Sequence, residues 1–326
     1  MEETIDILMA TYNGEKYIKE QIESILAQDY SNIRCIICDD CSTDRTYEIA
    51  KEYVKKDKRV IVYKNEKNLG VIKNFEKLLS LVESDYYMLA DQDDIWKTTK
   101  VSDTFQKLKK ENADLVFTDL EIVDENMQIK NHSFNRVMGI YPKISKEKDI
   151  RLVYLYNVVT GCTILTKKKY ISKILPLPTN KDVLHDHYIA LAILLSGGKV
   201  CYLDKPTIFY RQHQNNQVGT SRYTDRFKTF QEVRNHLIQV KISIFTTYCQ
   251  MNALFDEVYQ KKNNEALQYF SAIKKNRYIN LRGSKFYFSL YKDEKLSKKL
   301  LYFTIFHIPC IGRIGYLFKG VLQKHR

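Results

Sequence analysis

Three carboxylates stand within four residues in the segment Asp91-Gln92-Asp93-Asp94. The segment directly follows the apolar run at residues 86–90, where a buried strand would emerge into solvent. Like charges at this spacing repel one another, and a partly buried carboxylate is costly unless a cation or a proton neutralises it. Oxygen ligands suit Mg²⁺ and Mn²⁺, which take one or two protein carboxylates and leave other positions to substrate phosphates. The segment predicts a divalent-metal site, and the structural alternative is an acidic helix start.

The elements that would position these carboxylates are short apolar segments that alternate with helical patterns. We expect strands at residues 5–10, 33–38, 60–63 and 86–90, and helices at residues 17–27, 47–54 and 75–82. This alternation is typical of an α/β fold whose mostly parallel sheet lies between two layers of helices.

Polar clusters follow all four expected strands, at residues 11–14, 39–44, 65–70 and 91–94. Each cluster alone is better explained as a turn or a helix cap. Ligands of open α/β sheets bind beyond the carboxyl ends of the strands, so the four loops together predict one binding rim. Neither the dinucleotide fingerprint GxGxxG after the first strand nor the P-loop GxxxxGK[ST] is present, so we expect metal to hold the phosphates.

Residues 119–220 predict an acceptor-binding half with shorter strands and longer loops. His185-Asp186-His187 opens an apolar helix that ends at residues 196–198, and we expect Asp186 to cap it. The flanking histidines make a proton-handling role an equal alternative. A strand at residues 207–210 leads into Arg211-Gln212-His213, a group rich in hydrogen-bond donors.

The 326 residues, 44% of them hydrophobic, are enough for about two domain-sized units. The net charge of +13 comes entirely from residues 221–326, which hold 20 Lys and Arg against 7 Asp and Glu. Basic and aromatic residues together suggest an anionic membrane surface, while the apolar run at residues 300–309 is too short to cross a bilayer. A solvated helical face and a homodimer interface are the alternatives.

Seven cysteines and an acidic start without a signal-peptide pattern predict a reducing, cytoplasmic location. Cys35, Cys38 and Cys41 have metal-like spacing, but no second pair follows at the distance of a zinc finger. We interpret them as strand and turn positions.

Several motifs, taken in order, resemble family 2 glycosyltransferases with the GT-A-type fold, and most closely the bacterial rhamnosyltransferases of cell-wall polysaccharide synthesis. They are Thr11-Tyr12-Asn13-Gly14-Glu15, Asp39-Asp40, Asn68-Leu69-Gly70, Asp91-Gln92-Asp93-Asp94-Ile95-Trp96, His185-Asp186 and Tyr210-Arg211-Gln212-His213. The resemblance covers residues 5 to about 220. It implies a glycosyltransferase domain over residues 1–220, divided into a nucleotide-sugar half, 1–118, and an acceptor half, 119–220. A helical extension would follow at residues 221–326.

The resemblance also implies roles for individual residues. The nucleotide sugar would be bound by Thr11, Tyr12, Asn13, Glu15, Asp40, Lys73 and Asp91. Asp93 and His213 would hold Mn²⁺ or Mg²⁺, and Asp186 would be the catalytic base. The acceptor side would include Trp96, Gly161, Cys162 and His187. Two positions depart from the family pattern, since His185 replaces the usual Glu and Cys41 stands where Gly is frequent.

The reaction implied is an inverting transfer of L-rhamnose from dTDP-β-L-rhamnose to a lipid-linked rhamnose-containing glycan, with an α-1,3 linkage. The protein would act peripherally at the inner face of the bacterial cell membrane. Another nucleotide sugar is an alternative donor. The acidic cluster and the histidine also suit a metal-dependent nuclease or phosphoryl transferase. A nucleic-acid-binding module is disfavoured, because the excess charge avoids the motif-bearing region and no nucleic-acid signature accompanies it.

Overall fold

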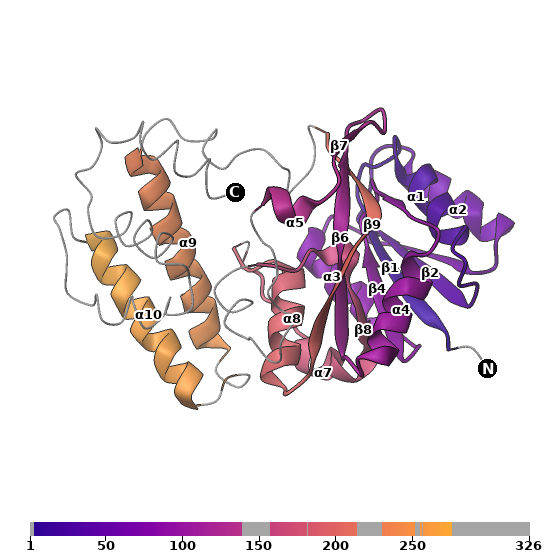
Figure 1. The fold of residues 1–326 in the computed structure, drawn as a ribbon. Coiled ribbons are helices and arrows are strands. Elements are labelled where there is room, and N and C mark those ends of the chain that lie inside the picture. Colours follow the sequence, from indigo (N-terminus) through magenta and orange to yellow (C-terminus); the bar gives the residue numbers. More distant parts are fainter. Residues whose placement is uncertain are drawn as a thin grey trace. The chain divides into compact units, whose positions relative to one another are not determined.

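The structure is a computed structural model that describes residues 3–138, 157–180, 182–213, 230–251, 255 and 257–275. The chain divides into two compact units, Met1–Gly219 and Thr220–Arg326. Figure 1 shows strands and helices in the first unit and helices in the second.

The first unit is an α/β layer structure built on one sheet. Its strands are β1 (Ile5–Thr11), β2 (Ile33–Asp39), β3 (Val60–Lys64), β4 (Tyr86–Ala90), β5 (Ile95–Trp96), β6 (Leu115–Val123), β7 (Ile129–Asn131), β8 (Leu165–Lys167) and β9 (Val200–Arg211). Its α-helices are α1 (Ile18–Leu26), α2 (Thr46–Lys56), α3 (Val71–Ser80), α4 (Lys100–Lys110), α5 (Phe134–Val137), α7 (Ile171–Ile174) and α8 (His185–Leu195). Two 3₁₀ turns, η1 (Gly161–Thr163) and η2 (Lys168–Tyr170), flank β8.

The strand order β3-β2-β1-β4-β8-β6-β9-β5 places β1 and β4 side by side near the middle of the sheet, and β7 pairs with β6. Strands β1 to β4 are parallel, β8 is antiparallel to both of its neighbours, and β6 is parallel to β9. Because β1, β2 and β4 are parallel, their carboxyl ends meet at one edge. The predicted mostly parallel sheet and its first four strands are confirmed.

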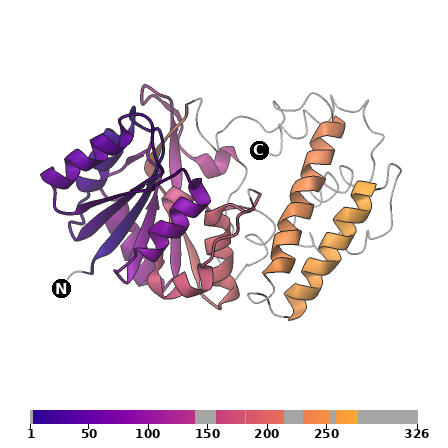
Figure 2. The same ribbon diagram turned by 180° about the vertical axis from the view of Figure 1, so that it is seen from behind.

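The two faces of the sheet are covered by different helices. Alternate residues of β1, namely Ile5, Ile7 and Met9, share a core with apolar residues of α1, α2 and α4. Helix α3 lies over the opposite face and buries Phe75 and Leu78 (Figures 1 and 2). The alternation of side chains along the strands thus explains why both faces need a helical layer.

The expectation of shorter strands in the acceptor half is confirmed for β7 and β8, which have three residues each, but is wrong for β9. Strand β9 has 12 residues and pairs with the nine-residue β6 along most of its length. Asp119 and Pro206 break the apolar pattern, and register shifts beside Asp119 accommodate them within the ladder. Continuous apolar runs in the sequence therefore underestimate the lengths of β6 and β9.

The second unit contains α9 (Phe230–Gln250) and α10 (Glu257–Lys275). Phe245 of α9 stacks on Phe270 of α10 with ring centroids 5.9 Å apart, and Tyr248 is fully buried. The helical structure expected within residues 221–326 is confirmed for these two segments. The aromatic segments at residues 286–288 and 300–309 lie outside the described residues. In the ranges that the structure covers, no helix has both the length and the apolarity needed to cross a bilayer.

Candidate active site

A cavity of about 1170 Å³ opens at the edge where β1, β2 and β4 end. It brings together most of the residues singled out from the sequence: Thr11, Tyr12, Asn13, Asp40, Asp91, Asp93, Gly161, Asp186 and His213. Six separate stretches of chain supply these residues. The predicted rim therefore exists as one concave site, the usual form of a small-ligand site.

The loop after β1 is joined to the acidic turn by a reciprocal pair of hydrogen bonds. The Tyr12 amide donates to Gln92 Oε1 at 2.9 Å, and Gln92 Nε2 donates to the Tyr12 carbonyl at 3.0 Å. A Cβ added to Gly14 would lie 2.4 Å from the Gln92 side chain, so glycine permits this approach. The Tyr12 ring is 46% exposed at the rim. An exposed aromatic face held by a fixed backbone suits stacking with a nucleotide base.

Asp40 is buried at the end of β2 and organises the neighbouring loop. Its Oδ1 accepts hydrogen bonds from the Leu69 amide and the Asn65 side chain, and its Oδ2 accepts one from the Gly70 amide, each at 2.8 Å. The carboxylate therefore fixes the third loop of the rim. Asp39 joins the end of β1 to the turn after β2, since it accepts hydrogen bonds from Thr11 and Ser42.

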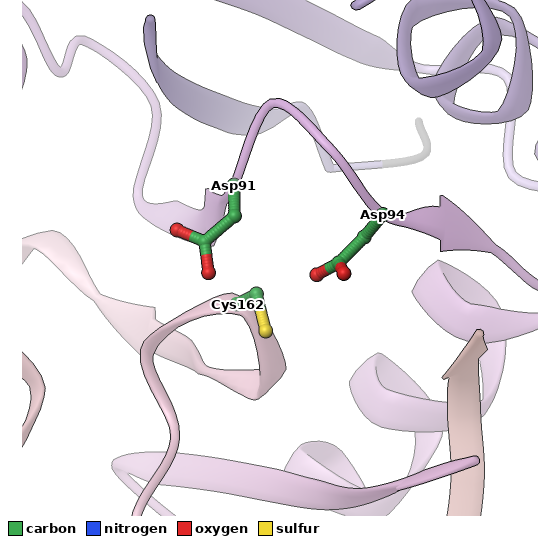
Figure 3. Close-up of side chains that lie close together, drawn as sticks. All are labelled: Asp91, Asp94 and Cys162. Atoms are coloured by element: carbon green, nitrogen blue, oxygen red, sulfur yellow. The ribbon is translucent and has the colours of Figure 1, made fainter. Parts of the chain in front are cut away.

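The acidic turn after β4 is organised differently. Ligand atoms of Asp91, Asp94 and Cys162 all lie within 4.8 Å of one another, and Figure 3 shows the three side chains facing a common space. Burial and the neighbouring carboxylates raise the pKa of Asp91 to about 7 and that of Asp94 well above its usual value. Burial also raises the pKa of the Cys162 thiol well above its usual value. A protonated thiol is a poor ligand, and Mg²⁺ and Mn²⁺ prefer oxygen, so this trio is a poor metal site.

A buried cation lies behind the same turn. Lys100 has no exposed surface, and its Nζ is 4.5 Å from the centre of the Trp96 ring. Burial lowers the pKa of Lys100 to about 8, against the effect of Cys162 and Asp94. Within the covered residues, Lys100 Nζ, Trp96 Nε1 and Asp94 Oδ2 have no hydrogen-bond partner. The acidic turn is thus a region of buried charge with few direct partners.

Asp93 and His213 form a hydrogen bond whose length is compatible with two adjacent metal ligands. His213 Nε2 lies 2.9 Å from Asp93 Oδ2. Adjacent ligand atoms of an octahedral Mg²⁺ ion, each at 2.0–2.1 Å from the metal, lie about 2.9 Å apart. One carboxylate and one imidazole leave the remaining positions of such an ion to phosphate and water. The two residues therefore fit a divalent metal.

Asp186 lies on the acceptor-half wall of the cavity, held by three donors. Its Oδ1 accepts hydrogen bonds from the His187 amide at 2.6 Å and Asn157 Nδ2 at 3.0 Å, and its Oδ2 accepts one from the Gly161 amide at 3.0 Å. The expectation that Asp186 caps helix α8 is wrong. Leu184 is the N-cap, and Asp186 lies inside the first turn with its carboxylate turned toward the Gly161 loop.

His185 supports the same wall. Its ring stacks on Phe75 of α3 with centroids 4.3 Å apart, and burial lowers its pKa, which favours the neutral imidazole. A Cβ on Gly161 would lie 3.1 Å from His185 Nε2 and 3.5 Å from Asp186 Cβ. Glycine at position 161 therefore allows its amide to approach the candidate base.

Five residues singled out from the sequence are not among the described side chains that line the cavity: Glu15, Lys73, Trp96, Cys162 and His187. Glu15 accepts a hydrogen bond from the Arg45 amide, and Lys73 pairs with Glu76. Trp96, Cys162 and His187 are buried behind the wall. Their side chains are placed to support neighbouring segments of the site.

Sequence reasoning missed Lys16, Tyr17, Glu125 and Asn157, all of which line the cavity. Tyr17 is the first residue of the helix expected at residues 17–27, and Glu125 comes from a turn with no motif. The hydrogen bond from Tyr17 Oη to Glu125 Oε2, 3.3 Å long, joins positions 108 residues apart, which no local pattern reveals.

The cysteine interpretation agrees with the structure. Cys35 and Cys38 are buried in β2, and Cys41 occupies the turn after it with a φ of 63°. This left-handed conformation explains the frequent glycine that the resemblance implies at position 41.

Comparison with known proteins agrees with this geometry. A family model described as glycosyl transferase family 2 matches residues 6–175. The dTDP-rhamnosyl transferase RfbG of Shigella flexneri is 30% identical over 269 residues, which span 76% of this chain and 85% of that protein.

Two solved structures share the fold. S. aureus TarS in complex with UDP superposes with a TM-score of 0.55 at 17% identity, covering 93% of this chain and 78% of that chain. A mannosyltransferase from Pyrobaculum calidifontis, in complex with GDP-Man and Mn²⁺, gives a TM-score of 0.56 at 13% identity, covering 94% and 84%. The predicted GT-A-type α/β fold is confirmed. With the fold, the family model and the RfbG similarity in agreement, the chain belongs to glycosyl transferase family 2.

Proposed function

We propose that the protein transfers L-rhamnose from dTDP-β-L-rhamnose to a hydroxyl of a lipid-linked, rhamnose-containing glycan. The observation that carries this proposal is the single cavity that joins Asp93 and His213 to Asp186 across the ends of separate strands. The sugar is proposed from the similarity to a dTDP-rhamnosyl transferase over most of both chains.

In this proposal Asp186 is the general base. An acceptor hydroxyl is a weak nucleophile at neutral pH, so a carboxylate within hydrogen-bond reach must take its proton as the new bond forms. The amides of Gly161 and His187 hold the Asp186 carboxylate in one orientation at the cavity wall. Direct attack on the anomeric carbon displaces the diphosphate in one step, so a β-linked donor gives an α-linked product.

On the donor side, Tyr12 and its neighbours would receive the base, and Asp91 would face the ribose. Asp93 and His213 would hold Mn²⁺ or Mg²⁺, which supplies Lewis-acid stabilisation to the departing diphosphate. Their atoms are already at the separation expected of two adjacent metal ligands.

A donor panel tests the proposal. The purified protein is incubated with Mn²⁺, a set of nucleotide sugars and a rhamnose-containing lipid-linked acceptor, and nucleoside diphosphate release is measured. We expect dTDP-L-rhamnose to be preferred and release to stop in excess chelator. Asp186→Asn should lower kcat by about 10²–10⁴-fold, as expected for the loss of a general base.

Near-native turnover of Asp186→Asn would contradict the assignment of the base. Preference for another nucleotide sugar would exclude rhamnose while retaining the reaction class. Cleavage of phosphodiesters without glycoside formation would instead support the metal-dependent nuclease or phosphoryl transferase.

Membrane association is part of the same proposal. Residues 221–326 carry all of the excess positive charge, which would attract an anionic bilayer surface and bring the cavity to a lipid-linked acceptor. Flotation with anionic and neutral vesicles tests this, and we expect the full chain to bind anionic vesicles in a salt-dependent manner. Concentration-dependent dimerisation without vesicle binding would favour the alternative of a homodimer interface.

A further inference from the structure

Tyr17 is a buried aromatic residue that contacts both sides of the candidate metal site. It immediately precedes α1 and is 8% exposed. Its ring stacks on the His213 ring with centroids 4.8 Å apart and an interplanar angle of 28°. The Arg211 guanidinium carbon lies 4.6 Å from the Tyr17 ring centre. One ring thus contacts two residues at the end of β9, on either side of Gln212.

Both of these β9 contacts lead to Asp93. His213 Nε2 lies 2.9 Å from the Asp93 carboxylate, and Arg211 Nε donates to the Asp93 carbonyl at 3.1 Å. Arg211 also forms an ion pair with Glu20 of α1, the helix that Tyr17 precedes. The loop after β1, the end of β9 and the acidic turn are therefore joined around the Tyr17 ring.

The stacked geometry has a consequence for coordination. A ring nitrogen binds a metal through a lone pair in the plane of the imidazole, so the face of the ring is free for packing. Tyr17 occupies a face of His213 and leaves its edge directed at Asp93. Hydrogen-bonding residues that orient a metal ligand typically change metal affinity by 10–100-fold when they are removed, and we expect a stacked ring that orients His213 to act on the same scale.

We propose that Tyr17 is a positioning residue for the divalent metal, and this inference rests on the proposed function. Its ring holds the His213 imidazole edge-on to Asp93 and, through Arg211, helps to fix the main chain of Asp93. The aromatic ring carries this role. The hydroxyl contributes little, because its hydrogen bond to the half-exposed Glu125 is 3.3 Å long.

Tyr53 provides a matched control within the same unit. It is 7% exposed, its hydroxyl donates to Glu23, and Lys56 Nζ lies 4.8 Å from its ring centre. Tyr17 has a parallel set of contacts, with Glu125 at its hydroxyl and Lys16 Nζ 4.8 Å from its ring centre. Tyr53 belongs to α2 and is not among the described residues that line the cavity. A comparison of variants at Tyr17 and Tyr53 therefore separates the loss of aromatic packing from the loss of metal positioning.

The test measures Mn²⁺ affinity of the full chain by calorimetric titration without donor, at neutral pH. The variants are Tyr17→Leu, Tyr17→Phe, Tyr53→Leu and His213→Ala, each checked by thermal unfolding. We expect Tyr17→Leu to weaken Mn²⁺ binding 10–100-fold. Tyr17→Phe and Tyr53→Leu should stay within about threefold of the parent, because the ring or the site remains intact. If Tyr17→Leu does not fold, Tyr17→Met replaces it as the ring-deleting variant.

A thermodynamic cycle completes the test. In a His213→Ala background, Tyr17→Leu should cause a smaller loss of affinity than in the parent, because the ligand on which its ring stacks is gone. Equal Mn²⁺ affinity of Tyr17→Leu and Tyr53→Leu would overturn the inference alone, provided that His213→Ala still weakens binding. A parent protein that binds no Mn²⁺, or a His213→Ala variant with unchanged affinity, would overturn the proposed metal site and the inference with it.

Discussion

The end of β2 and the turn after β4 contribute carboxylates to the same edge of the sheet, yet these carboxylates have different partners. At the end of β2, Asp39 and Asp40 accept hydrogen bonds from Ser42 and from the Leu69 and Gly70 amides. In the acidic turn, Asp94 Oδ2 has no partner among the residues covered, and the pKa of Asp91 is raised. The first pair of carboxylates builds loops, whereas in the acidic turn Asp93, whose carboxylate contacts His213, is the candidate metal ligand.

This contrast shows why a count of acidic residues does not locate a metal site. A carboxylate whose lone pairs already accept backbone N–H groups has little capacity to coordinate an ion. Asp93 differs from Asp40 because its observed side-chain contact is another candidate ligand, His213. The partners of each carboxylate therefore distinguish structural acids from binding ones.

The largest effect on stability is expected from an isosteric comparison of Asp40→Asn with Asp94→Asn. Asp40→Asn points an amide nitrogen at a buried backbone donor and should lower the free energy of unfolding by about 2–3 kcal/mol. Asp94→Asn should cost less than about 1 kcal/mol, because Oδ2 has no hydrogen bond to lose within the described chain. Urea unfolding of both variants measures the difference. Equal losses in the free energy of unfolding would contradict the proposed difference between Asp40 and Asp94.

A somewhat smaller effect is expected where the two regions meet. Gly14→Ala would force the Gln92 side chain away and break its two hydrogen bonds with Tyr12, at a cost of about 2 kcal/mol. Nucleotide affinity should fall with it, as measured by titration with dTDP. Gln92→Ala should have a similar effect, and the double variant should be no worse than either single one. Additive losses would show that the two residues act independently.

Asp114 extends the comparison to a carboxylate at the start of β6. Burial would raise its pKa, but hydrogen bonds from Lys169, the Lys199 amide and Lys167 outweigh this and lower the pKa to about 2. A depressed folded-state pKa stabilises the protein above the unfolded-state value near 4, and the stabilisation is lost as the pH falls from about 4 to 2. Asp114→Asn should therefore lower the free energy of unfolding by about 1 kcal/mol at pH 7, discounted for partial exposure.

Urea unfolding of the parent protein and Asp114→Asn between pH 7 and pH 3 checks this prediction. The two curves of stability against pH should converge toward the acid end. A constant difference across that range would mean that the hydrogen bonds of Asp114 do not favour its ionised form.

The smallest effect is expected at Cys41. A side chain at a φ of 63° is strained relative to glycine, while glycine adds entropy to the unfolded chain. Cys41→Gly should therefore change stability by only about 0.5 kcal/mol, in the stabilising direction, and should leave nucleotide affinity unchanged. A thermal unfolding series that includes Cys41→Ala separates strain from loss of the thiol, since alanine keeps the strain.

The N-terminal strands and their loops were predictable because each is a local pattern. The apolar runs at β1, β2 and β4 are buried in the sheet, and the polar residues that follow them reach the cavity. The loop-building role of Asp40 was not predictable, because its partners Leu69 and Gly70 lie on the next loop, about 30 residues away. The sequence shows that a carboxylate is present, but only the fold shows which groups donate hydrogen bonds to it.

The acceptor half was harder to predict for the same reason. Strand β9 contains Asp204, Lys205 and Pro206, which hide its continuity. Asn157 and Tyr17 reach the site through contacts with distant segments, and neither belongs to a polar motif. Asp186 was found as a candidate, but its orientation depends on the Gly161 loop and not on helix capping.

The central claim is that Asp93 and His213, and not the nearby trio Asp91, Asp94 and Cys162, hold the metal opposite Asp186. A crystal structure with Mn²⁺ and dTDP, with data collected at the manganese absorption edge, tests it directly. The account predicts one anomalous peak in contact with Asp93 and His213 and with the diphosphate of dTDP. A peak bound by Cys162 with Asp91 and Asp94, or no peak at saturating Mn²⁺, would contradict it.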